Sequence, residues 1–419
     1  MAYDVVIMPG RVRGNVTLPP SKSLLHRALF CAAFAPGIST VGPRHDCGDI
    51  RDTLKVLKAL GASIETTHDA YRITGISNYK DTVTLSIDAS ATTLRLLIPV
   101  LAATRTAATI SLGPSLANRP ITSYEHLFGS GVKKHGASVI IDAALPPGNL
   151  VLGQLESSQV LSGLLVAFAI VRSTATIHVE SLPSAAYVTL TASVLDIAGV
   201  RVVQEGGVYR LQSGEHLRPF KVDVEGDASH ASLWLACGVL GGPLSVKGLR
   251  DTSLQADAIF PALLASIKAN ITYENGLITA FPGRVQSFRL SVDAHPDLAF
   301  ALALVALHAD GPCVLSDVHR LRIKESDRVE AIAASLRALG VDVQQGQKTM
   351  TIHPMSSLRG DVCLEANDDH RLAMMLALCA PLLNAPIVIR GADAVEKSYP
   401  DFFTQCRALG LTLTQQKGR

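Results

Sequence analysis

The chain is poor in aromatic residues and in charged residues of either sign. Aromatic side chains make up 5% and charged side chains 18% of its 419 residues, with one tryptophan and a formal net charge of +2. Proteins that hold nucleic acid need a basic surface, commonly interleaved with aromatic side chains. We therefore expect no nucleic-acid partner, and any bound anion must be held by a few locally placed cations.

Long hydrophobic runs and a signal-peptide pattern are also absent. The most apolar stretches, residues 298–309 and 232–246, are too short or too interrupted by Gly and Pro to cross a bilayer. The opening segment, MAYDVVIMPGRVRG, lacks the hydrophobic core of a secretory signal. We expect a cytoplasmic monomer with no membrane partner.

The cysteines form no CxxC pair, and several lie in apolar runs that are typical of helices. We expect buried, reduced thiols, as is usual in a reducing cytosol. No metal-ligand set and no cofactor motif is visible, so we expect neither metal nor cofactor. The seven cysteines are Cys31, Cys47, Cys237, Cys313, Cys363, Cys379 and Cys406.

A pattern that recurs six times dominates what the sequence does contain. In each copy a helix-like run ends in a small residue, usually Gly, and a β-branched strand follows. Glycine is the expected residue after a helix because it adopts the left-handed conformation without steric penalty. Turns such as Asn275-Gly276 and Gly206-Gly207 then predict a hairpin to a second strand. The six pivots are Gly61, Gly136, Gly199, Ala269, Gly340 and Gly410.

Six α/β units exceed the size of one ordinary core and divide naturally into two domains of three units each. Chance recurrence of a common helix–turn–strand motif is the alternative that this pattern alone leaves open. With 48% apolar residues, the chain suits a compact protein and not a disordered one.

Clusters of chemistry-bearing residues precede several predicted helices in the first half of the chain. Lys22, Ser23 and Arg27 lie in SKSLLHRA, where the free N–H groups of a helix start favour anions. Small residues in SIDASATTLR lead toward Arg95 and would let a backbone approach a ligand closely. For each cluster the plain alternative is a capped helix with solvated charges. The other clusters in this half contain Arg119, the patch Glu156-Ser157-Ser158-Gln159, and Ser184 with Tyr187, which are expected to share a helical face.

The strongest cluster is the RLRIKESDR segment of residues 320–328. Lys324 and Arg328 are expected one helical turn apart with Glu325 beside them, so that they can bind phosphate and also offer a carboxylic acid for proton transfer. A solvated charged helix is the alternative. The remaining clusters are Asp297 in DAHPD, Asn367 to Arg371 in NDDHR, and Lys397 in KSYP.

Six of these segments, in this order, resemble the enolpyruvyl transferases of the EPSP synthase family (3-phosphoshikimate 1-carboxyvinyltransferases). The segments are SKSLLHRA, SSQ, VEGDAS, RIKESDR, DDHR and KSYP, and the resemblance runs from residue 18 to residue 403. It implies an α/β fold of two similar domains, each an inside-out α/β barrel of three units, with the active site in the interdomain cleft. We place the first domain at residues 15–223 and the second at 1–14 together with 224–419.

The resemblance also implies a reaction in the shikimate pathway, toward chorismate and the aromatic amino acids. The enolpyruvyl group of phosphoenolpyruvate would move to the 5-hydroxyl of 3-phosphoshikimate by addition and elimination, with release of phosphate. The small anions 3-phosphoshikimate and phosphoenolpyruvate are the expected partners.

By matching position, Asp297 would take the proton of the attacking hydroxyl, Glu325 would protonate the methylene carbon, and Lys324 and Lys22 would assist. The expected phosphoshikimate contacts are Lys22, Ser23, Arg27, Ser157, Ser158, Gln159, Ser184, Tyr187, Asp297 and Lys324. The expected phosphoenolpyruvate contacts are Lys22, Ala91, Arg119, Gln159, Arg328, Arg371 and Lys397.

The sequence departs from the family pattern at five positions in four segments, which bear on affinity and inhibitor response more than on the reaction class. Ala91 replaces the glycine against which the herbicide glyphosate packs in sensitive members, so we expect insensitivity. The other departures are Ala89 for an Asn, Pro114 for an acidic residue, Arg320 for a frequent Asn, and Glu156 before SSQ.

Three alternatives remain. UDP-N-acetylglucosamine enolpyruvyl transferases share the fold and the chemistry but use a Cys where this chain has Pro114. RNA 3′-phosphate cyclases have related repeats but need nucleic-acid contacts. A non-catalytic binding protein on the same scaffold would have no need of Asp297, Lys324 and Glu325.

Overall fold

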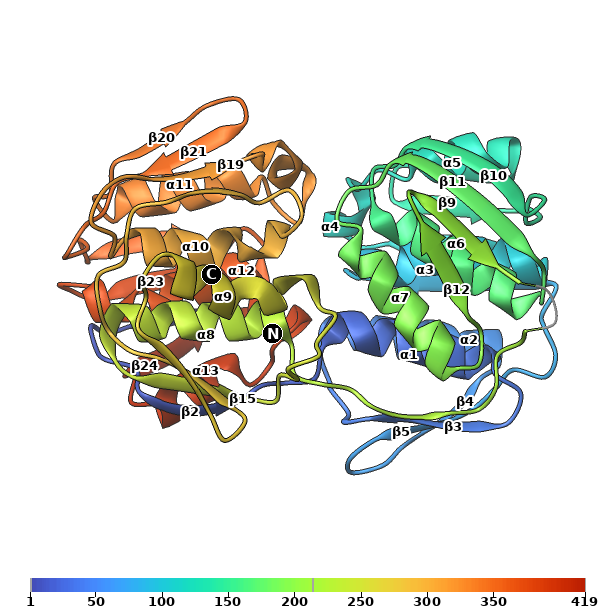
Figure 1. Ribbon diagram of the computed structural model, residues 1–419, viewed down its shortest axis with the longest axis horizontal. Coiled ribbons are helices and arrows are strands. Elements are labelled where there is room, and N and C mark those ends of the chain that lie inside the picture. Colours follow the sequence, from blue (N-terminus) through green and yellow to red (C-terminus); the bar gives the residue numbers. More distant parts are fainter. Residues whose placement is uncertain (1, 213–214, 419) are drawn as a thin grey trace. The chain divides into compact units, whose positions relative to one another are not determined.

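The structure is a computed structural model that describes residues 2–212 and 215–418. The chain forms two compact units, which we call unit 1 (Met1–Pro19 with Glu225–Arg419) and unit 2 (Pro20–Val224). Figure 1 shows both units in sequence colours, with unit 2 running from blue to green. Each unit contains three four-stranded sheets and is described here by itself.

All six sheets share one pattern of strand pairing. Each sheet has two neighbouring parallel strands, which in four sheets are joined through a helix and in the other two come from segments distant in the sequence. The other two strands are antiparallel to each other, and one of them pairs antiparallel with a strand of the parallel pair; in five sheets these two strands form a hairpin, and in the sixth they come from the two ends of the chain. Three sheets are thus continuous βαβαββ repeats, and the other three have the same strand pairing but are completed by a distant strand.

Unit 2 is built around helices α1, α3 and α6, which pack against one another. Its helices are α1 (Lys22–Phe34), α2 (Gly48–Leu60), α3 (Ala91–Thr104), α4 (Pro114–Ala117), α5 (Thr122–Phe128), α6 (Ser158–Ile170) and α7 (Ala186–Ile197), with the 3-10 turn Gly129–Gly131. Its strands are β3 (Ile38–Gly42), β4 (Ser63–Thr66), β5 (Tyr71–Thr74), β6 (Thr82–Ile87), β7 (Ala107–Leu112), β8 (Val132–His135), β9 (Ser138–Ile141), β10 (Asn149–Gln154), β11 (Ala175–Ser181), β12 (Val202–Glu205), β13 (Val208–Leu211) and β14 (Lys221–Asp223).

Unit 1 repeats this plan around helices α8, α10 and α12. Its α-helices are α8 (Ala228–Gly241), α9 (Phe260–Ser266), α10 (Ala299–Ala306), α11 (Arg328–Ala338), α12 (His370–Leu378) and α13 (Phe402–Ala408). Its 3-10 helices are η2 (Ala256–Ile259), η3 (Pro296–Leu298), η4 (Val318–Ile323), η5 (Ala380–Leu382) and η6 (Ala392–Lys397). Its strands are β1 (Tyr3–Ile7), β2 (Gly14–Thr17), β15 (Leu244–Lys247), β16 (Ile271–Glu274), β17 (Leu277–Ala280), β18 (Arg289–Ser291), β19 (Cys313–Ser316), β20 (Val343–Gln345), β21 (Thr349–Ile352), β22 (Val362–Glu365), β23 (Ile387–Arg390) and β24 (Leu413–Lys417).

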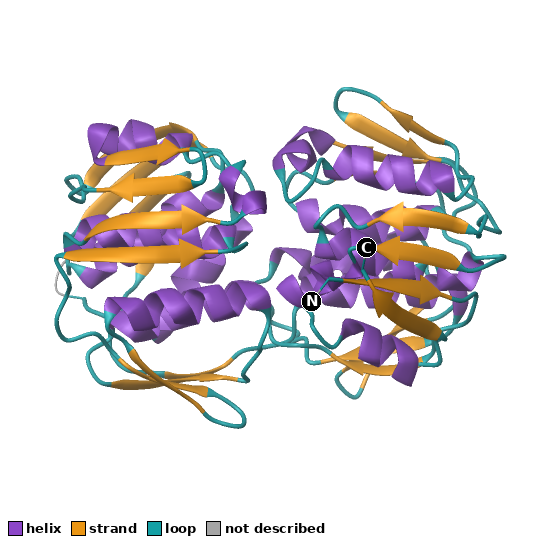
Figure 2. Cartoon of the chain, turned by 180° about the vertical axis from the view of Figure 1, so that it is seen from behind, coloured by secondary structure: helices purple, strands orange, loops and turns teal. Residues whose placement is uncertain are grey.

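The helices lie inside each unit and the sheets lie outside. Nearly every side chain of α6, α8 and α10 is buried, and a helix that is apolar all round is stable only in a core. Figure 2 shows the strands of each unit covering its central helices. This arrangement is the inside-out α/β barrel that the family resemblance implied.

Three strands enter sheets far from their sequence neighbours. Strand β1 pairs with β23 and β24, and β2 pairs with β15, so the first strands of the chain complete two sheets of unit 1. Strand β14 pairs with β3 and completes the first sheet of unit 2. The units therefore divide after Pro19 and after Val224, whereas the sequence placed the first crossing near Gly14. Residues 15–19 belong to unit 1 because β2 pairs there.

Four of the six predicted pivots are glycines with positive φ within two residues of a helix end and before a strand: Gly61, Gly199, Gly340 and Gly410. At the Ala269 pivot the left-handed residue is Lys268, one position earlier. The prediction at Gly136 is wrong. VKKH before it is strand β8, not the end of a helix, and Gly136 lies in the hairpin turn to β9. The hairpins at Gly206-Gly207 and Asn275-Gly276 are confirmed.

No helix within the described residues is long and apolar enough to cross a membrane.

Candidate active site

In unit 1, a group of charged side chains gathers at the starts of helices α10, α11 and α12. Asp297 lies in η3 directly before α10, Arg328 is the first residue of α11, and Asp369 is the N-cap of α12. The N-cap carboxylate of Asp369 accepts the backbone N–H of Arg371, as short polar side chains do at helix starts. We call Asp297, Lys324, Glu325, Arg328, Asp369, Arg371 and Lys397 the charged cluster.

Arg328 is the centre of the charged cluster. Its side chain is 1% exposed, and its three guanidinium nitrogens each contact a carboxylate at 2.7 Å: Nη1 with Asp297, Nη2 with Glu325 and Nε with Asp369. The guanidinium also lies over the ring of Phe300, 5.1 Å from its centroid. A buried planar donor fork of this kind holds several carboxylates in fixed positions, which a flexible lysine would not do.

Arg371 holds the second oxygen of Asp297, with Nη2 2.9 Å from Oδ2. Its Nε and Nη1 are buried and have no hydrogen-bond partner among the described residues. Leaving buried cationic donors unpaired is costly in a folded protein, so such donors are well suited to receive an anionic ligand. Arg371 therefore has two buried donors that an anionic ligand could engage.

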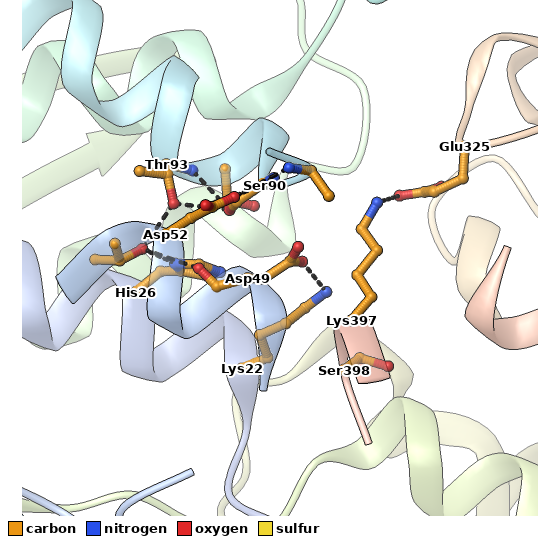
Figure 3. A network of polar contacts seen from close by, with 12 residues as sticks. Lys22, His26, Asp49, Asp52, Ser90, Thr93, Glu325, Lys397 and Ser398 are labelled. Atoms are coloured by element: carbon orange, nitrogen blue, oxygen red, sulfur yellow. Dashed lines mark hydrogen bonds and ion pairs between the residues drawn. The ribbon is translucent and has the colours of Figure 1, made fainter. Parts of the chain in front are cut away.

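Lys397 contacts Glu325, which also contacts Arg328. The ammonium of Lys397, at the end of η6, lies 3.8 Å from Glu325 Oε1 (Figure 3). The KESD segment is not helical as the sequence suggested: η4 ends at Ile323, Lys324 has extended backbone, and α11 begins only at Arg328. Lys324 and Arg328 are thus not stacked on one helix, and the break lets Glu325 turn back toward Arg328.

The surroundings of the charged cluster shift the pKa values of two groups that the sequence placed in catalysis. Burial alone would raise the pKa of Asp297, but Arg371, Arg328 and Lys324 outweigh it and hold that pKa below its usual range. Burial lowers the pKa of Lys324 to about 8; Asp297 opposes this shift and Arg328 adds to it. Asp297 is therefore ionised at neutral pH, and Lys324 can lose its proton near neutrality.

A second buried carboxylate, Asp257, lies in η2 and was not singled out from the sequence. Its Oδ2 accepts a short hydrogen bond from Ser229, and His295 Nδ1 lies 3.8 Å from its Oδ1. Burial, and then the charge of Asp297, raise the pKa of Asp257 to about 7. The two carboxyl groups thus differ strongly in acidity, with Asp297 ionised and Asp257 protonated below neutrality.

In unit 2, Lys22 is the first residue of α1, and its ammonium lies 2.5 Å from Asp49 Oδ2 (Figure 3). Asp49 stands in the first turn of α2, where the helix dipole favours a carboxylate. The helix start at Lys22 agrees with the sequence prediction. The pairing with Asp49 was missed, because the two residues lie 27 positions apart and only packing of α1 on α2 joins them.

Arg27 is buried among neutral oxygens. Its guanidinium donates to Thr191 Oγ1 (2.7 Å), to the carbonyl of Ser23 (2.7 Å) and to the carbonyl of Tyr187 (3.1 Å). Burial lowers the pKa of Arg27 to about 10, so the group remains a cation at neutral pH. A buried cation whose hydrogen-bond acceptors are all uncharged is a good site for an anion.

Gln159 lies where helices α3 and α6 approach each other closely. A side chain at Gly163 would come within 2.8 Å of the carbonyl of Arg95, so glycine is needed for this approach. The Gln159 amide accepts from Arg95 Nη1 at 3.0 Å and donates to Thr92 Oγ1 at 2.7 Å. Ser157 caps α6 by accepting from the N–H of Gln159, and the next residue, Ser158, is buried.

Ala91 is the first residue of α3, and a carboxylate anchors the backbone just before it. Asp52 accepts the backbone N–H groups of Asp88, Ala89 and Ser90 at 3.0 to 3.2 Å. Figure 3 shows this contact and the hydroxyl chain from Ser90 through Thr93 toward His26. The small residues that were expected to approach a ligand are thus held against α2.

Three predicted residues lie in less regular positions. Ser184 has a positive φ and precedes α7, so it does not share a helical face with Tyr187 as the sequence suggested. Arg119 is buried in the turn after α4, and its carbonyl accepts from Lys134. Glu156 accepts the N–H and the hydroxyl of Ser123, so this departure from the family pattern secures the start of α5.

Comparison with known proteins decides the family. The family model "EPSP synthase (3-phosphoshikimate 1-carboxyvinyltransferase)" matches residues 6–406. The chain belongs to the EPSP synthase family. It is 33% identical to the 3-phosphoshikimate 1-carboxyvinyltransferase of Clostridium kluyveri, covering 97% of both chains. It is 32% identical to the protein of the same name from Actinobacillus pleuropneumoniae serotype 3, covering 95% of this chain and 97% of the relative.

Solved structures agree on the fold. An EPSP synthase from Acinetobacter baumannii superimposes with a TM-score of 0.82 at 24% identity, covering 99% of this chain and all of that one. The enolpyruvyl transferase NikO from Streptomyces tendae superimposes with a TM-score of 0.81 at 19% identity over the whole of both chains. The same fold thus carries differently named enolpyruvyl transferases, so the fold alone does not select the acceptor substrate.

Arg320 is one of the residues at which this chain departs from the EPSP synthase family pattern, and its side chain contacts Asp293. Its Nη1 donates to the carbonyl of Asp293 at 2.9 Å and to the carboxylate of Asp293 at 3.1 Å. This contact ties η4 to the segment that precedes Asp297. Within the described residues, no group of three or more His, Cys, Asp and Glu side chains is arranged to hold a metal ion.

Proposed function

We propose that this chain transfers the enolpyruvyl group of phosphoenolpyruvate to the 5-hydroxyl of 3-phosphoshikimate, giving 5-enolpyruvylshikimate 3-phosphate and inorganic phosphate. Family membership over residues 6–406 supports the reaction class. The observation that carries the proposal is the charged cluster, in which Arg328 joins Asp297 and Glu325 by contacts of 2.7 Å. A proton-dependent addition to an anionic substrate needs an acid and a base, which the two carboxyl groups can supply, and cations that bind the anion.

The chemistry assigns the two carboxyl groups different tasks. The enolpyruvyl C2 atom becomes electrophilic only when the methylene carbon C3 gains a proton, which Glu325 would donate. The 5-hydroxyl oxygen then bonds to C2 while Asp297 takes its proton. The resulting tetrahedral intermediate loses phosphate as C3 returns a proton to the protein, which restores the double bond. Asp297 is suited to the base role because its surroundings keep it ionised.

Binding of an anion would also change how these carboxyl groups behave. In this structure, Arg328, Arg371 and Lys397 contact Asp297 and Glu325. A phosphoenolpyruvate molecule that takes over some of these N–H groups would leave the carboxyl groups with less compensating positive charge. The pKa of Asp297 would then rise, which makes Asp297 a stronger base.

Residues of unit 2 would hold the shikimate substrate. Arg27 offers a buried cation with neutral partners, and Ser157, Ser158 and Gln159 present polar groups at the start of α6. Lys22 and Arg119 would contribute further positive charge, as the resemblance implies. Since one chain supplies all the groups that the reaction needs, we propose that it acts as a monomer. We also propose a cytoplasmic location, in agreement with seven free cysteines, six of them buried.

The residues of this chain favour 3-phosphoshikimate over the alternative acceptor substrate, UDP-N-acetylglucosamine. The position that carries a Cys in those enzymes is Pro114, which begins the short helix α4. The curated relatives reported above are all named for the shikimate reaction.

A phosphate-release assay with phosphoenolpyruvate and either acceptor tests the proposal. We expect phosphate and a product of the mass of 5-enolpyruvylshikimate 3-phosphate with 3-phosphoshikimate only. An exposed ion-pair variant, Arg210→Ala, serves as the control and should retain wild-type turnover, because Arg210 forms an exposed ion pair with Glu205. Release with UDP-N-acetylglucosamine alone would reverse the acceptor assignment. Binding of both shikimate-pathway substrates without turnover would identify a non-catalytic binding protein.

A further inference from the structure

In unit 1, the side chains of Asp227, His230 and Ser398 are buried and contact one another in that order, and Ser398 directly follows Lys397. His230, in the first turn of α8, is 1% exposed, and its Nε2 lies 3.2 Å from Ser398 Oγ. Its Nδ1 lies 3.5 Å from Oδ1 of Asp227, the N-cap of α8, and the same oxygen accepts the backbone N–H of His230 at 3.0 Å.

The order of these groups is that of a nucleophilic triad, but the burial of the hydroxyl excludes that role. Ser398 has no exposed surface, so a substrate cannot reach its oxygen. In a nucleophile site the hydroxyl must meet the reacting carbon directly. The three groups are better understood as a structural connection between the start of α8 and the segment that follows η6.

This connection fixes the backbone immediately after Lys397. His230 contacts two consecutive residues there: it hydrogen-bonds Ser398 and packs against the ring of Tyr399, with centroids 4.7 Å apart. The N–H groups of Ser398 and Tyr399 both donate to the carbonyl of Val395, so residues 395–399 form a hydrogen-bonded turn. The chain at residues 398–399 is therefore attached to α8 by a side chain that is itself held at Asp227.

The position of the Lys397 ammonium depends on that attachment. Lysine has four flexible side-chain bonds, so its charge is only as well placed as its backbone and its contacts. In this structure the ammonium lies 3.8 Å from Glu325 Oε1 (Figure 3). A displacement of about 1 Å at such a group can cost on the order of 100-fold in rate or affinity.

We propose that His230 is a positioning residue that holds Lys397, through Ser398 and Tyr399, where it meets the phosphoenolpyruvate anion. This inference rests on the proposed function, since it assumes that Lys397 binds phosphoenolpyruvate. It assigns His230 a selective effect: the affinity for phosphoenolpyruvate depends on it, whereas the affinity for 3-phosphoshikimate, whose expected contacts lie mainly in unit 2, does not.

Steady-state kinetics of His230→Ala, Ser398→Ala and His230→Gln test the selectivity. For His230→Ala we expect the KM for phosphoenolpyruvate to rise about tenfold, with the KM for 3-phosphoshikimate changed less than about twofold. Ser398→Ala should show the same pattern more weakly. His230→Gln can still donate to Ser398 and should recover part of the loss. Equal increases of both KM values, or no increase in either, would overturn the inference.

Trp234→Phe is the matched control. Trp234 lies one turn further along α8, packs on Phe402 of α13 with ring centroids 5.3 Å apart, and hydrogen-bonds the Tyr399 side chain. The Phe variant removes that bond and part of the packing but keeps the contact between His230 and Ser398. We expect this variant to lose stability while its KM for phosphoenolpyruvate stays within about twofold of wild type. A rise equal to that of His230→Ala would show that general loosening of the core explains the effect, and the inference would fail.

Hydrogen exchange of the ligand-free protein tests the connection independently of catalysis. The amides of Ser398 and Tyr399 should exchange faster in His230→Ala than in wild type, because the turn is no longer attached to α8. Unchanged exchange at these amides would refute the attachment even if activity fell. A wild-type protein that releases no phosphate would refute the proposed function instead, while the exchange data would still decide whether His230 holds this turn.

Discussion

Arg328 Nη1 lies 2.7 Å from Asp297 Oδ1, so the expected base of the reaction is paired with a cation that is expected to bind phosphoenolpyruvate. Arg371 holds the other oxygen of the same carboxylate at 2.9 Å. These contacts stabilise the ionised form of Asp297 and lower its basicity. An anionic substrate that competes for the two guanidinium groups would release the carboxylate for proton transfer.

Removal of either carboxyl group should abolish most of the turnover. We expect Glu325→Gln and Asp297→Ala each to lower kcat by about 100-fold or more, the usual scale for the loss of a positioned acid or base. Circular dichroism should show that both variants remain folded. Glu365→Gln is the control, because Glu365 forms an exposed ion pair with Arg390. Near-normal kcat in both cluster variants would rule out the proton transfers proposed above.

The decrease of kcat/KM at alkaline pH should reflect the deprotonation of Lys324. Its pKa is lowered to about 8, so its ammonium charge is present below that pH and is lost as the pH rises through it. We expect kcat/KM for phosphoenolpyruvate to fall above about pH 8, since this parameter follows groups of the free enzyme. Lys324→Arg keeps the charge at all these pH values and should move the fall to higher pH. An identical alkaline limb in both proteins would assign it to another group.

The Ala91 methyl group should weaken inhibition by glyphosate. Glyphosate is longer than phosphoenolpyruvate, and an extra methyl in a filled pocket costs about 1–3 kcal/mol. That corresponds to roughly a 5- to 150-fold loss of affinity. A local backbone shift could make room, but the three N–H groups held by Asp52 oppose such a shift. Phosphoenolpyruvate, being shorter, should lose less.

Inhibition of wild type and Ala91→Gly, each in competition with phosphoenolpyruvate, measures this effect. The glycine variant should bind glyphosate more tightly, while its KM for phosphoenolpyruvate changes less. Glycine at the first position of α3 also lowers helix stability by up to about 1 kcal/mol, so the thermal midpoint is measured in parallel. Equal and tight inhibition of both proteins would show that the methyl does not crowd the site.

Asp257 should make unit 1 less stable as the pH rises from about 4 to 7. Its pKa is raised to about 7 in the folded state, whereas an unfolded Asp titrates near 4. Between these values the folded state holds a proton that the unfolded state has released. Stability therefore falls across this window and levels off above it.

Asp257→Asn removes this proton linkage, while its side-chain oxygen can still accept from Ser229. Relative to wild type, the variant should gain stability steadily as the pH increases from about 4 to 7. Urea unfolding of both proteins at several pH values gives the difference. A difference that does not vary with pH would mean that Asp257 is ionised throughout.

The sequence by itself determined the repeat and the chemistry of the motifs. Glycines such as Gly61 and Gly340 marked helix ends because positive φ is a local, steric property of the residue. The same local reasoning failed at Gly136, where a left-handed glycine serves a hairpin and not a helix end, since both turns need the same backbone conformation. Residue types that bind anions and move protons were likewise visible in RIKESDR and DDHR.

Tertiary structure alone decided which of these groups meet. Arg328 reaches Asp297 and Asp369, which lie 31 and 41 residues away, and Arg371 reaches Asp297 across 74 residues. No local pattern encodes such pairs, because they follow from the packing of α10, α11 and α12. The entry of β1, β2 and β14 into distant sheets is of the same kind. Strand partners and ion pairs depend on which apolar surfaces are buried together, and that is a property of the whole fold.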